Sequence, residues 1–362
     1  MTRVRHVVPG PQRHGVTRHA LDLLSRAPLA EHAVHRVLPD GVDSPAQVTT
    51  ALAAVPEAPL VHLHLTDHLL APTATECADI VAEFAESRAG AVSLMLHDLP
   101  QPADGPGRHE RRRAAYARMA SVARGVVVGS EHERTLLLDA LTAEGLTSGP
   151  IQVVPLPIDR LDPVASVAPA TSPTGPRRLV VFGYLYPGKG HQQAVEALAS
   201  LPADVGVLAL GAVSPGHEHL VTDLQARATA LGREFTATGY VPEDAVLAQL
   251  RAAAVPLAPH VHVSASGSIG SWLAAGRRPL VPAGAYVDEL ESRCPGALFR
   301  YGPGLPHPDL AAAAHAALAD PGLTWLGGVE VGPDPTEVAA RLARVLHTWS
   351  AAGSPRLLRA RS

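Results

Sequence analysis

Short apolar runs alternate with stretches of helical periodicity along the whole chain. The runs predict buried strands at residues 4–10, 32–38, 60–65, 91–97, 125–130 and 151–157, and again at 178–185, 205–213, 235–240, 254–260, 278–284 and 297–302. Between them, segments such as 16–27, 75–90, 130–145, 191–201 and 219–232 have the spacing of amphipathic helices. This alternation predicts parallel sheets covered by helices on both faces.

Residues 161–177 interrupt the alternation. Four prolines with Ser, Thr and Gly make this segment a candidate linker. We therefore predict an α/β protein with two Rossmann-like, doubly wound domains, at 1–160 and 178–334, facing across a cleft. Residues 335–362 are expected to form a terminal helix able to pack back on the first domain. Ligands of such sheets bind at the carboxyl ends of the strands, so the cleft is the expected site.

Composition narrows the class of protein. Hydrophobic residues make up 46% and charged residues 18%, which favours a folded globular chain. A net charge of −4 and a pI near 6.5 argue against nucleic-acid binding. The two cysteines form no CxxC pair, and the sequence has neither a signal-peptide pattern nor a membrane-length apolar run, so a cytoplasmic protein is expected.

Lys189 is the single lysine among 30 Lys and Arg residues. It lies between two glycines in "FGYLYPGKGH", where a predicted strand passes through a glycine-rich loop into a helix that begins near His191. Glycines let backbone N–H groups approach a ligand, and a compact ammonium beside a helix N-terminus suits a phosphate. The motif is not a P-loop. An exposed lysine in an ordinary turn is the alternative.

A second element that suits phosphate follows in "HVHVSASGSIGSW". Ser264, Ser266 and Ser268 flank Gly267 directly before a helical pattern. Free N–H groups at a helix start, together with hydroxyls, form an anion-binding nest. The alternative is a plain serine cap. Two anion sites in one domain favour a diphosphate over a single phosphate.

The second half of the chain resembles the nucleotide-sugar-binding domain of glycosyltransferase family 4, which has the GT-B fold. Gly183, Leu185, Lys189 and Gly190 keep the spacing of that family's Gly-Arg-Leu…Lys-Gly motif. "FTATGYVPEDAVLAQL" and "LAAGRRPLVPAGAYVDEL" resemble two further family segments, and the second of them includes Glu289.

The first half resembles the same family more loosely. "GPQRHGVTRHALDLL", which includes Gly15, resembles its glycine-rich first loop, and "SLMLHDLP" resembles its Thr-x-His-Asp segment. The resemblance implies a retaining transferase that moves a hexose-type sugar from a nucleotide-diphosphate sugar to an acceptor hydroxyl, with no metal or other cofactor. It implies donor binding by Gly15, Gly183, Tyr184, Lys189, Ser266, Gly267, Ser268 and Glu289, with Lys189 also serving catalysis.

Two departures from the family pattern leave alternatives open. Tyr184 stands where the family has an arginine that binds phosphate, and Val263 and Ser271 stand where it has a pair of glutamates. The chain therefore resembles a variant without the paired glutamates. Another GT-B enzyme, such as a sugar-nucleotide epimerase or a pseudo-glycosyltransferase coupling enzyme, and a non-catalytic sugar-nucleotide-binding subunit remain alternatives.

His97 and Asp98 end a predicted strand of the first domain. The resemblance places them on the acceptor side, with His97 beside the reacting groups as a hydrogen-bond donor or proton relay; a capped loop histidine is the alternative. His62 and His64 share one strand face and with His97 suggest a metal set. No Asp, Glu or Cys cluster completes it, so no metal is expected.

Five arginines occur in Arg108–Arg118. They predict either a solvated helix face or a peripheral contact with an anionic membrane or an acceptor phosphate. The expected partners are a nucleotide-sugar donor and an unidentified sugar, lipid or natural-product acceptor. The acceptor, the donor base and the oligomeric state cannot be read from the sequence.

Overall fold

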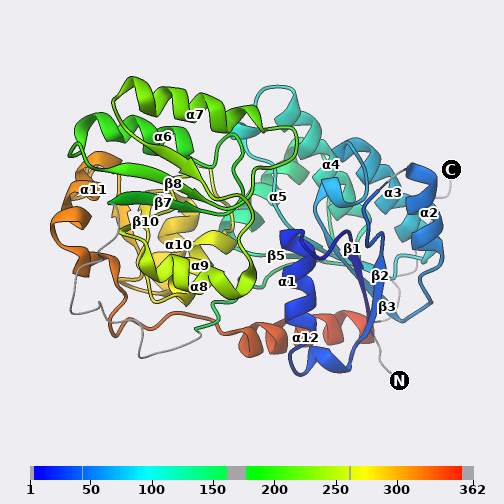
Figure 1. The fold of residues 1–362 in the computed structure, drawn as a ribbon. Helices are drawn as coiled ribbons and strands as arrows, with labels where there is room; N and C mark the ends of the chain where they lie inside the picture. The colour runs from blue at the N-terminus through cyan, green and yellow to red at the C-terminus, as the bar shows by residue number, and fades with distance from the viewer. Residues whose placement is uncertain (1–3, 43, 161–176, 261, 353–362) are drawn as a thin grey trace. The chain divides into compact units, whose positions relative to one another are not determined.

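The computed structural model describes residues 4–42, 44–160, 177–260 and 262–352 (Figure 1). The chain divides into two compact units, Met1–Leu156 with Pro333–Ser362, and Pro157–Gly332. Each unit has its own six-stranded sheet. The predicted linker lies outside the described residues except for Arg177.

The first unit is built on six strands in the order β2-β1-β3-β4-β5-β6, and every neighbouring pair is parallel. The strands are β1 (Val4–Pro9), β2 (Ala33–Val37), β3 (Leu60–Leu65), β4 (Val92–Leu96), β5 (Val126–Val128) and β6 (Ile151–Val153). The helices are α1 (Gly15–Leu24), α2 (Pro45–Ala53), α3 (Ala74–Ser87), α4 (Arg108–Val122), α5 (Glu131–Ala143) and α12 (Pro335–Ala351).

Alternating strand residues supply two separate cores in this unit. One face packs Val61, Leu63 and Leu65 of β3 against α2, α3, α4 and α5. The opposite face packs Leu60 of the same strand against α1 and α12. Because successive side chains of a strand point to opposite faces, His62 and His64 lie on the α1 and α12 side.

Helix α12 is the terminal helix that the periodicity predicts. Asp334 caps it and forms a capping box with Glu337, and its buried residues include Leu342, Leu346 and Trp349. These side chains belong to the core of the first unit. Helix α12 therefore packs on the first sheet, although it follows the second unit in the sequence.

The second unit repeats the plan with the strand order β12-β11-β10-β7-β8-β9, again entirely parallel. Its strands are β7 (Arg178–Phe182), β8 (Gly206–Leu210), β9 (Phe235–Ala237), β10 (Val255–Leu257), β11 (Leu280–Pro282) and β12 (Phe299–Tyr301). Its helices are α6 (His191–Ala197), α7 (His219–Ala230), α8 (Glu243–Ala252), α9 (Gly267–Ala274), α10 (Ala285–Arg293) and α11 (Leu310–Ala319).

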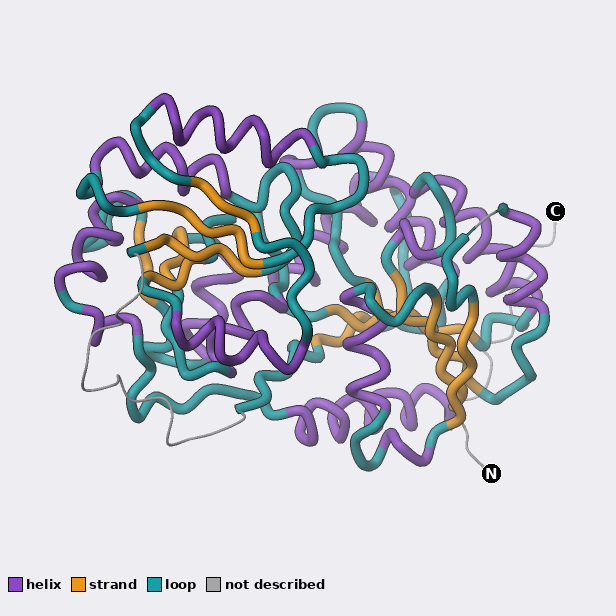
Figure 2. Tube along the Cα trace, viewed as in Figure 1, coloured by secondary structure: helices purple, strands orange, loops and turns teal. Residues whose placement is uncertain are grey.

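Figure 2 shows the strands of each unit in orange, flanked by helices in purple. In the second unit α6, α7 and α11 cover one face of the sheet, and α8, α9 and α10 cover the other. All twelve predicted strands are present. Among the helices of the described residues, none combines the length and apolarity needed to cross a bilayer.

Candidate functional site

The carboxyl ends of β7 and β10 lie side by side in the second sheet. From β7 the chain moves to β8 and β9 on one side, while β10, β11 and β12 lie on the other. The strand order therefore reverses between β7 and β10, and parallel α/β sheets bind ligands at such a switch point. The loop after β7 carries Lys189, and the loop after β10 carries Ser266.

A chain of side-chain hydrogen bonds joins these two loops. Lys189 Nζ donates to Ser268 Oγ at 2.8 Å. Ser268 Oγ lies 3.1 Å from Ser266 Oγ, which lies 3.2 Å from His260 Nε2. Ser266 also caps α9, because its Oγ accepts the Ile269 N–H at 3.2 Å. The two phosphate-binding elements expected from the sequence thus form one cluster in the structure.

The Lys189 side chain is buried, with 6% of the residue exposed. The partner that the structure gives its ammonium is a neutral hydroxyl rather than a carboxylate. Burial lowers the pKa of Lys189 to about 8, because desolvation disfavours the charged form. An ammonium held this way at the carboxyl edge of a sheet is chemically suited to a phosphate, whose charge would replace the lost hydration.

Glycine is required where the two loops approach each other. Gly190 has φ +93°, and a Cβ there would lie 2.5 Å from Pro259 Cγ. Gly183 has φ +112°, and a Cβ there would lie 3.4 Å from Lys189 Nζ. Both positions combine a left-handed backbone with limited space, so the glycines beside the lysine allow the β7 loop to reach the β10 loop.

Two histidines of this cluster were missed by sequence reasoning. His191 and His260 are buried. Burial lowers the pKa of His191 to about 3 and that of His260 well below its ordinary value, and the charge of Lys189 adds to both effects. They are therefore neutral at neutral pH, and His260 is the one that hydrogen-bonds within the cluster, through Ser266. The available signal was that each directly flanks a predicted anion-binding loop.

The remaining predicted donor residues lie in varied environments. Gly267 opens α9 directly after the cap, and Ser264 is buried in the preceding loop. Tyr184 is 41% exposed in the loop after β7. Glu289 on α10 lies 3.7 Å from Arg293 Nη1. Gly15, in the first unit, is the first residue of α1.

In the first unit His97 and Asp98 directly follow β4. The backbone N–H of His97 donates to the Leu65 carbonyl at 2.9 Å. The His97 ring packs edge-on against the His19 ring, with 5.6 Å between the ring centroids. Burial lowers the pKa of His97 well below its ordinary value, with His19 adding to the effect. Asp98 has φ +56°, which is uncommon for a residue with a Cβ and occurs mostly at constrained sites.

A buried arginine, Arg112 of α4, holds Asp98 in that conformation. Its Nη2 donates to the Asp98 carbonyl at 2.8 Å and to the Asp98 carboxylate at 3.1 Å. Its Nε binds Asp67 at 3.0 Å, and its Nη1 binds Asp104 at 2.6 Å. One guanidinium therefore connects the segments that follow β3 and β4.

The arginine run of α4 differs in part from both sequence interpretations. Arg112 is only 4% exposed, so it belongs neither to a solvated face nor to a membrane-facing one. Arg113 pairs with Glu144, and Arg118 pairs with Asp79. The helical spacing was visible in the sequence, but the inward direction of Arg112 depends on Asp67 and Asp104, which lie outside that run.

A group suited to a metal lies on the α1 and α12 face of the first sheet. Among the described residues, His6, His62 and His64 form a group in which each ring offers one nitrogen within 4.8 Å of the others. The candidate metal set suggested by the sequence combined His62 and His64 with His97 instead. The residue that it missed, His6, comes from β1 and pairs in register with His62.

No family profile and no curated protein sequence matches this chain. Solved structures do. A structure of the Anabaena protein HepE with UDP and glucose superposes with a TM-score of 0.73 at 16% identity, over 96% of this chain and 100% of the other. Sucrose-phosphate synthase from Thermosynechococcus elongatus gives 0.69 at 15% identity, over 98% and 100%.

A third similar structure is WaaG, a glycosyltransferase involved in lipopolysaccharide biosynthesis. It gives a TM-score of 0.58 at 15% identity, over 96% of this chain and 97% of that one. At these identities the likeness concerns the fold. It confirms the predicted class, an α/β chain with two Rossmann-like, doubly wound domains of the GT-B type.

The Arg112 network predicts a pH-dependent loss of stability when the arginine is removed. Burial alone would raise the pKa of Asp67, but Arg112 outweighs it and holds that pKa below its ordinary value. In the wild type, Asp67 therefore stabilises the fold at neutral pH, and this contribution is lost as the pH falls through its depressed pKa. We expect Arg112→Ala to lower the free energy of unfolding by about 3–5 kcal/mol at pH 7, because an uncompensated carboxylate stays buried.

The deficit should shrink at pH values near the ordinary range of Asp, because an unpaired buried Asp67 takes up a proton there more readily than in the wild type. Arg118→Ala is the matched control: its pair with Asp79 is exposed, so a change of at most about 1 kcal/mol is expected. Denaturant unfolding of the three proteins across pH provides the measurement. Equal stability of Arg112→Ala and Arg118→Ala would show that the network contributes no more than a surface pair.

Proposed function

We propose that this chain is a retaining glycosyltransferase that moves a hexose-type sugar from a nucleotide-diphosphate sugar to an acceptor hydroxyl. The observation that carries the proposal is the buried ammonium of Lys189, joined to Ser268 at the switch point of the second sheet. Solved structures of similar fold hold UDP with glucose, or UDP-glucose, which supports a donor of this class.

The cluster provides what departure of a nucleoside diphosphate needs. As the bond between the sugar carbon and the phosphate oxygen lengthens, negative charge grows on the diphosphate. The Lys189 ammonium, the Ser266 and Ser268 hydroxyls and the first N–H groups of α9 can bind that charge without reorganising. We assign Gly183, Tyr184, Gly267 and Glu289 of the second unit, and Gly15 of the first, to donor binding, as their positions in the family motifs imply.

On the acceptor side we assign His97 and Asp98. The neutral His97 imidazole can accept or donate a hydrogen bond, and Arg112 fixes the backbone of the residue that follows it. Retention is proposed because the family resemblance implies it. The sequence offers no pair of glutamates for double displacement, so we propose attack on the same face that the diphosphate leaves.

The wider assignments remain proposals of the same kind. We propose transfer without a divalent metal, a cytoplasmic location, and an acceptor that is a sugar, a lipid or a natural product. Peripheral membrane contact through Arg108–Arg118 remains a prediction. Three arginines of this run, Arg112, Arg113 and Arg118, pair with carboxylates of the first unit.

One observation favours a second candidate, a non-catalytic subunit that binds sugar nucleotides. Ser271, at one of the two positions where the family has glutamate, donates its hydroxyl to the Gly267 carbonyl of its own helix at 2.9 Å. Such a group offers no carboxylate to a donor ribose. Slow hydrolysis of the donor in the absence of acceptor would separate the candidates, because only an active transferase cleaves the sugar–phosphate bond.

The proposed contact of Lys189 with the donor predicts the affinity for nucleoside diphosphates. Calorimetric titration of the wild type with a panel of nucleoside diphosphates should detect binding, and Lys189→Ala should weaken it by about 1.5–3 kcal/mol, or roughly 10- to 150-fold. Lys189→Arg should recover only part of this loss, because a longer, forked guanidinium does not fit a nest formed by loop backbone. Arg178→Ala is the control. It removes a cation at the start of β7, which pairs with Glu234. Unchanged binding by Lys189→Ala would make Lys189 a turn residue.

The lysine also predicts the pH dependence of that affinity. Burial lowers the pKa of free Lys189 to about 8, whereas a bound diphosphate favours the ammonium. Above pH 8 the free protein must take up a proton to bind, so the dissociation constant should rise by up to about tenfold per pH unit. Below pH 8 it should level off, and Lys189→Ala should show no such rise. A wild-type dissociation constant that stays the same between about pH 7 and about pH 10 would contradict the assigned contact.

Turnover should depend on His97 in a different way. We expect His97→Ala to lower the rate of donor hydrolysis about 10²- to 10⁴-fold, the usual contribution of a positioned proton-transfer group. The dissociation constant for the nucleoside diphosphate should stay unchanged, since His97 is assigned to the acceptor side. If His97→Ala turns over at the wild-type rate, His97 is a loop histidine. If His97→Ala loses only donor affinity, His97 belongs to the donor side.

Metal independence gives the last prediction of this group. The diphosphate charge is met by Lys189, hydroxyls and helix N–H groups, so donor hydrolysis should continue after brief treatment with EDTA. Addition of Mg²⁺ or Mn²⁺, the hard cations that bind phosphate oxygens, should not accelerate it. Complete loss of turnover in EDTA followed by recovery with Mn²⁺ would contradict the proposal.

A further inference from the structure

Three imidazoles occupy a part of the first unit that would ordinarily be apolar core. His6 lies on β1, and His62 and His64 lie on β3, all on the sheet face that α1 and α12 cover. Each of the three is 0% exposed. Leu60, Val8 and Leu342 belong to the core on the same face, so the rings are polar groups in hydrophobic surroundings.

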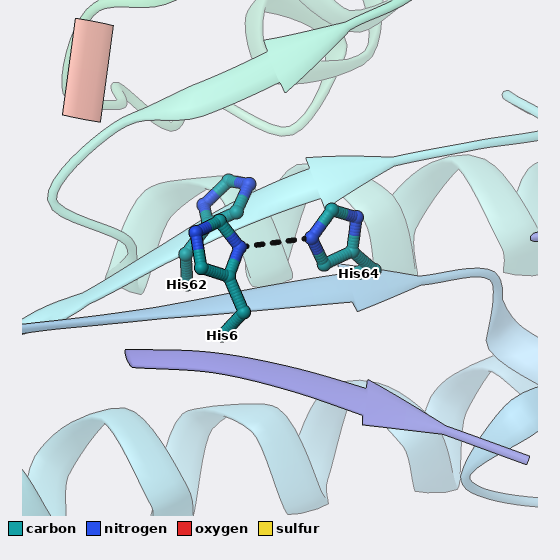
Figure 3. Close-up of side chains that lie close together, drawn as sticks. All are labelled: His6, His62 and His64. Carbon is teal, nitrogen blue, oxygen red and sulfur yellow. Dashed lines mark hydrogen bonds between the residues drawn. The ribbon is translucent and has the colours of Figure 1, made fainter. Parts of the chain in front are cut away.

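The rings are arranged as a metal would require. Each offers one nitrogen within 4.8 Å of those of the other two, and His6 Nδ1 lies 3.1 Å from His64 Nε2 (Figure 3). Nitrogens bound to one tetrahedral zinc at its usual bond length stand about 3.3 Å apart. Two of the rings therefore already have this separation, and the His62 ring lies beside His6 in the same view.

The hydrogen bonds of the cluster assign a ligand atom to two of the three rings. His62 Nδ1 is held by Ser93 Oγ at 2.9 Å, and His6 Nε2 is held by His32 Nδ1 at 3.0 Å. Metal-binding histidines characteristically have their second nitrogen fixed in this way. His62 Nε2 is buried with no hydrogen-bond partner among the described residues. A buried lone pair without a partner is costly. His6 Nδ1 and His64 Nε2, which share a hydrogen bond in this structure, are the facing atoms of the other two rings.

The donor set determines the chemical class of the ion. Burial lowers the pKa of His6 to about 3, with His32 adding to the effect, and lowers those of His62 and His64 well below their ordinary range. All three rings are then unprotonated at neutral pH, the form that binds metals. Imidazole nitrogens suit Zn²⁺, Co²⁺, Ni²⁺ and Cu²⁺, whereas Mg²⁺ and Ca²⁺ prefer the oxygen ligands that this group lacks.

We propose that His6, His62 and His64 bind one divalent transition-metal ion of the zinc class, which ties β1 to β3 as a structural ion of the first unit. This site is separate from the Lys189 cluster and does not rest on the proposed sugar transfer. It also does not conflict with metal-independent transfer, because the donor diphosphate is met in the second unit by groups that need no ion.

The test uses the full chain after dialysis against a strong chelator. Titration with Co²⁺, whose visible absorption reports tetrahedral nitrogen ligands, should saturate at one ion per chain, and Zn²⁺ should displace it and raise the melting temperature with concentration. His62→Gln and His64→Gln should each weaken binding at least tenfold. His219→Gln, an exposed histidine of α7 in the second unit, should leave binding unchanged and is the control for adventitious surface binding.

Two results would overturn the proposal. One is a folded, chelator-treated wild type that binds neither ion at micromolar concentration. The other is stoichiometric binding that survives both His62→Gln and His64→Gln. If those variants do not fold, X-ray absorption of the wild-type zinc complex decides the question: three imidazole ligands support the site, and fewer than three contradict it.

Discussion

The proposed donor site depends on one constraint, an ammonium that is buried without a carboxylate. Lys189 Nζ has a serine hydroxyl as its partner and is largely removed from water. A charge in that position costs free energy, which appears as the lowered pKa of the lysine. Natural structures retain such cost mainly where a ligand later compensates for it. The left-handed glycines, the close approach of Gly190 to Pro259 and the serine cap of α9 all serve to hold this one group in place.

The buried cation of the first unit, Arg112, is paired with carboxylates, unlike Lys189. Arg112 is equally buried but fully engaged, because it binds Asp67, Asp98 and Asp104 at once. It therefore stabilises a backbone conformation rather than waiting for a ligand, and the positive φ of Asp98 is the conformation that it supports. The contrast separates a group that we propose to bind substrate from a group that positions its neighbours, although both are buried cations.

The sequence predicted the fold well because apolar runs and period-3.6 patterns are local. Every strand was found from a run of adjacent apolar residues, and the start of α6 near His191 was read correctly from neighbouring residues. Lys189 and Ser268 were also singled out, since Lys189 lies between glycines in the loop after a predicted strand and Ser268 follows Gly267 at a predicted helix start. Their mutual contact could be anticipated only once β7 and β10 were known to be adjacent.

What the sequence could not predict depends on contacts between distant segments. His6 joins His62 and His64 because β1 pairs with β3 in a particular register, which no single stretch of sequence encodes. Arg112 points inward because three carboxylates from outside its helix surround it. The helices α2, α10 and α11 were also not singled out. For α11 the reason is that the Ala-rich segment Leu310–Ala319 shows little contrast between its faces.

Because Lys189 is the single lysine, its ammonium can be observed alone. Protein labelled with ¹³C at the lysine ε-carbon should give one NMR signal from that position, and its titration reports the pKa of Lys189 directly. We predict a pKa of about 8 in the free protein, a shift of the signal when a nucleoside diphosphate is added, and a higher pKa in the complex. A signal that titrates at the ordinary value of about 10.4 and does not respond to any nucleoside diphosphate would contradict the proposed role of Lys189.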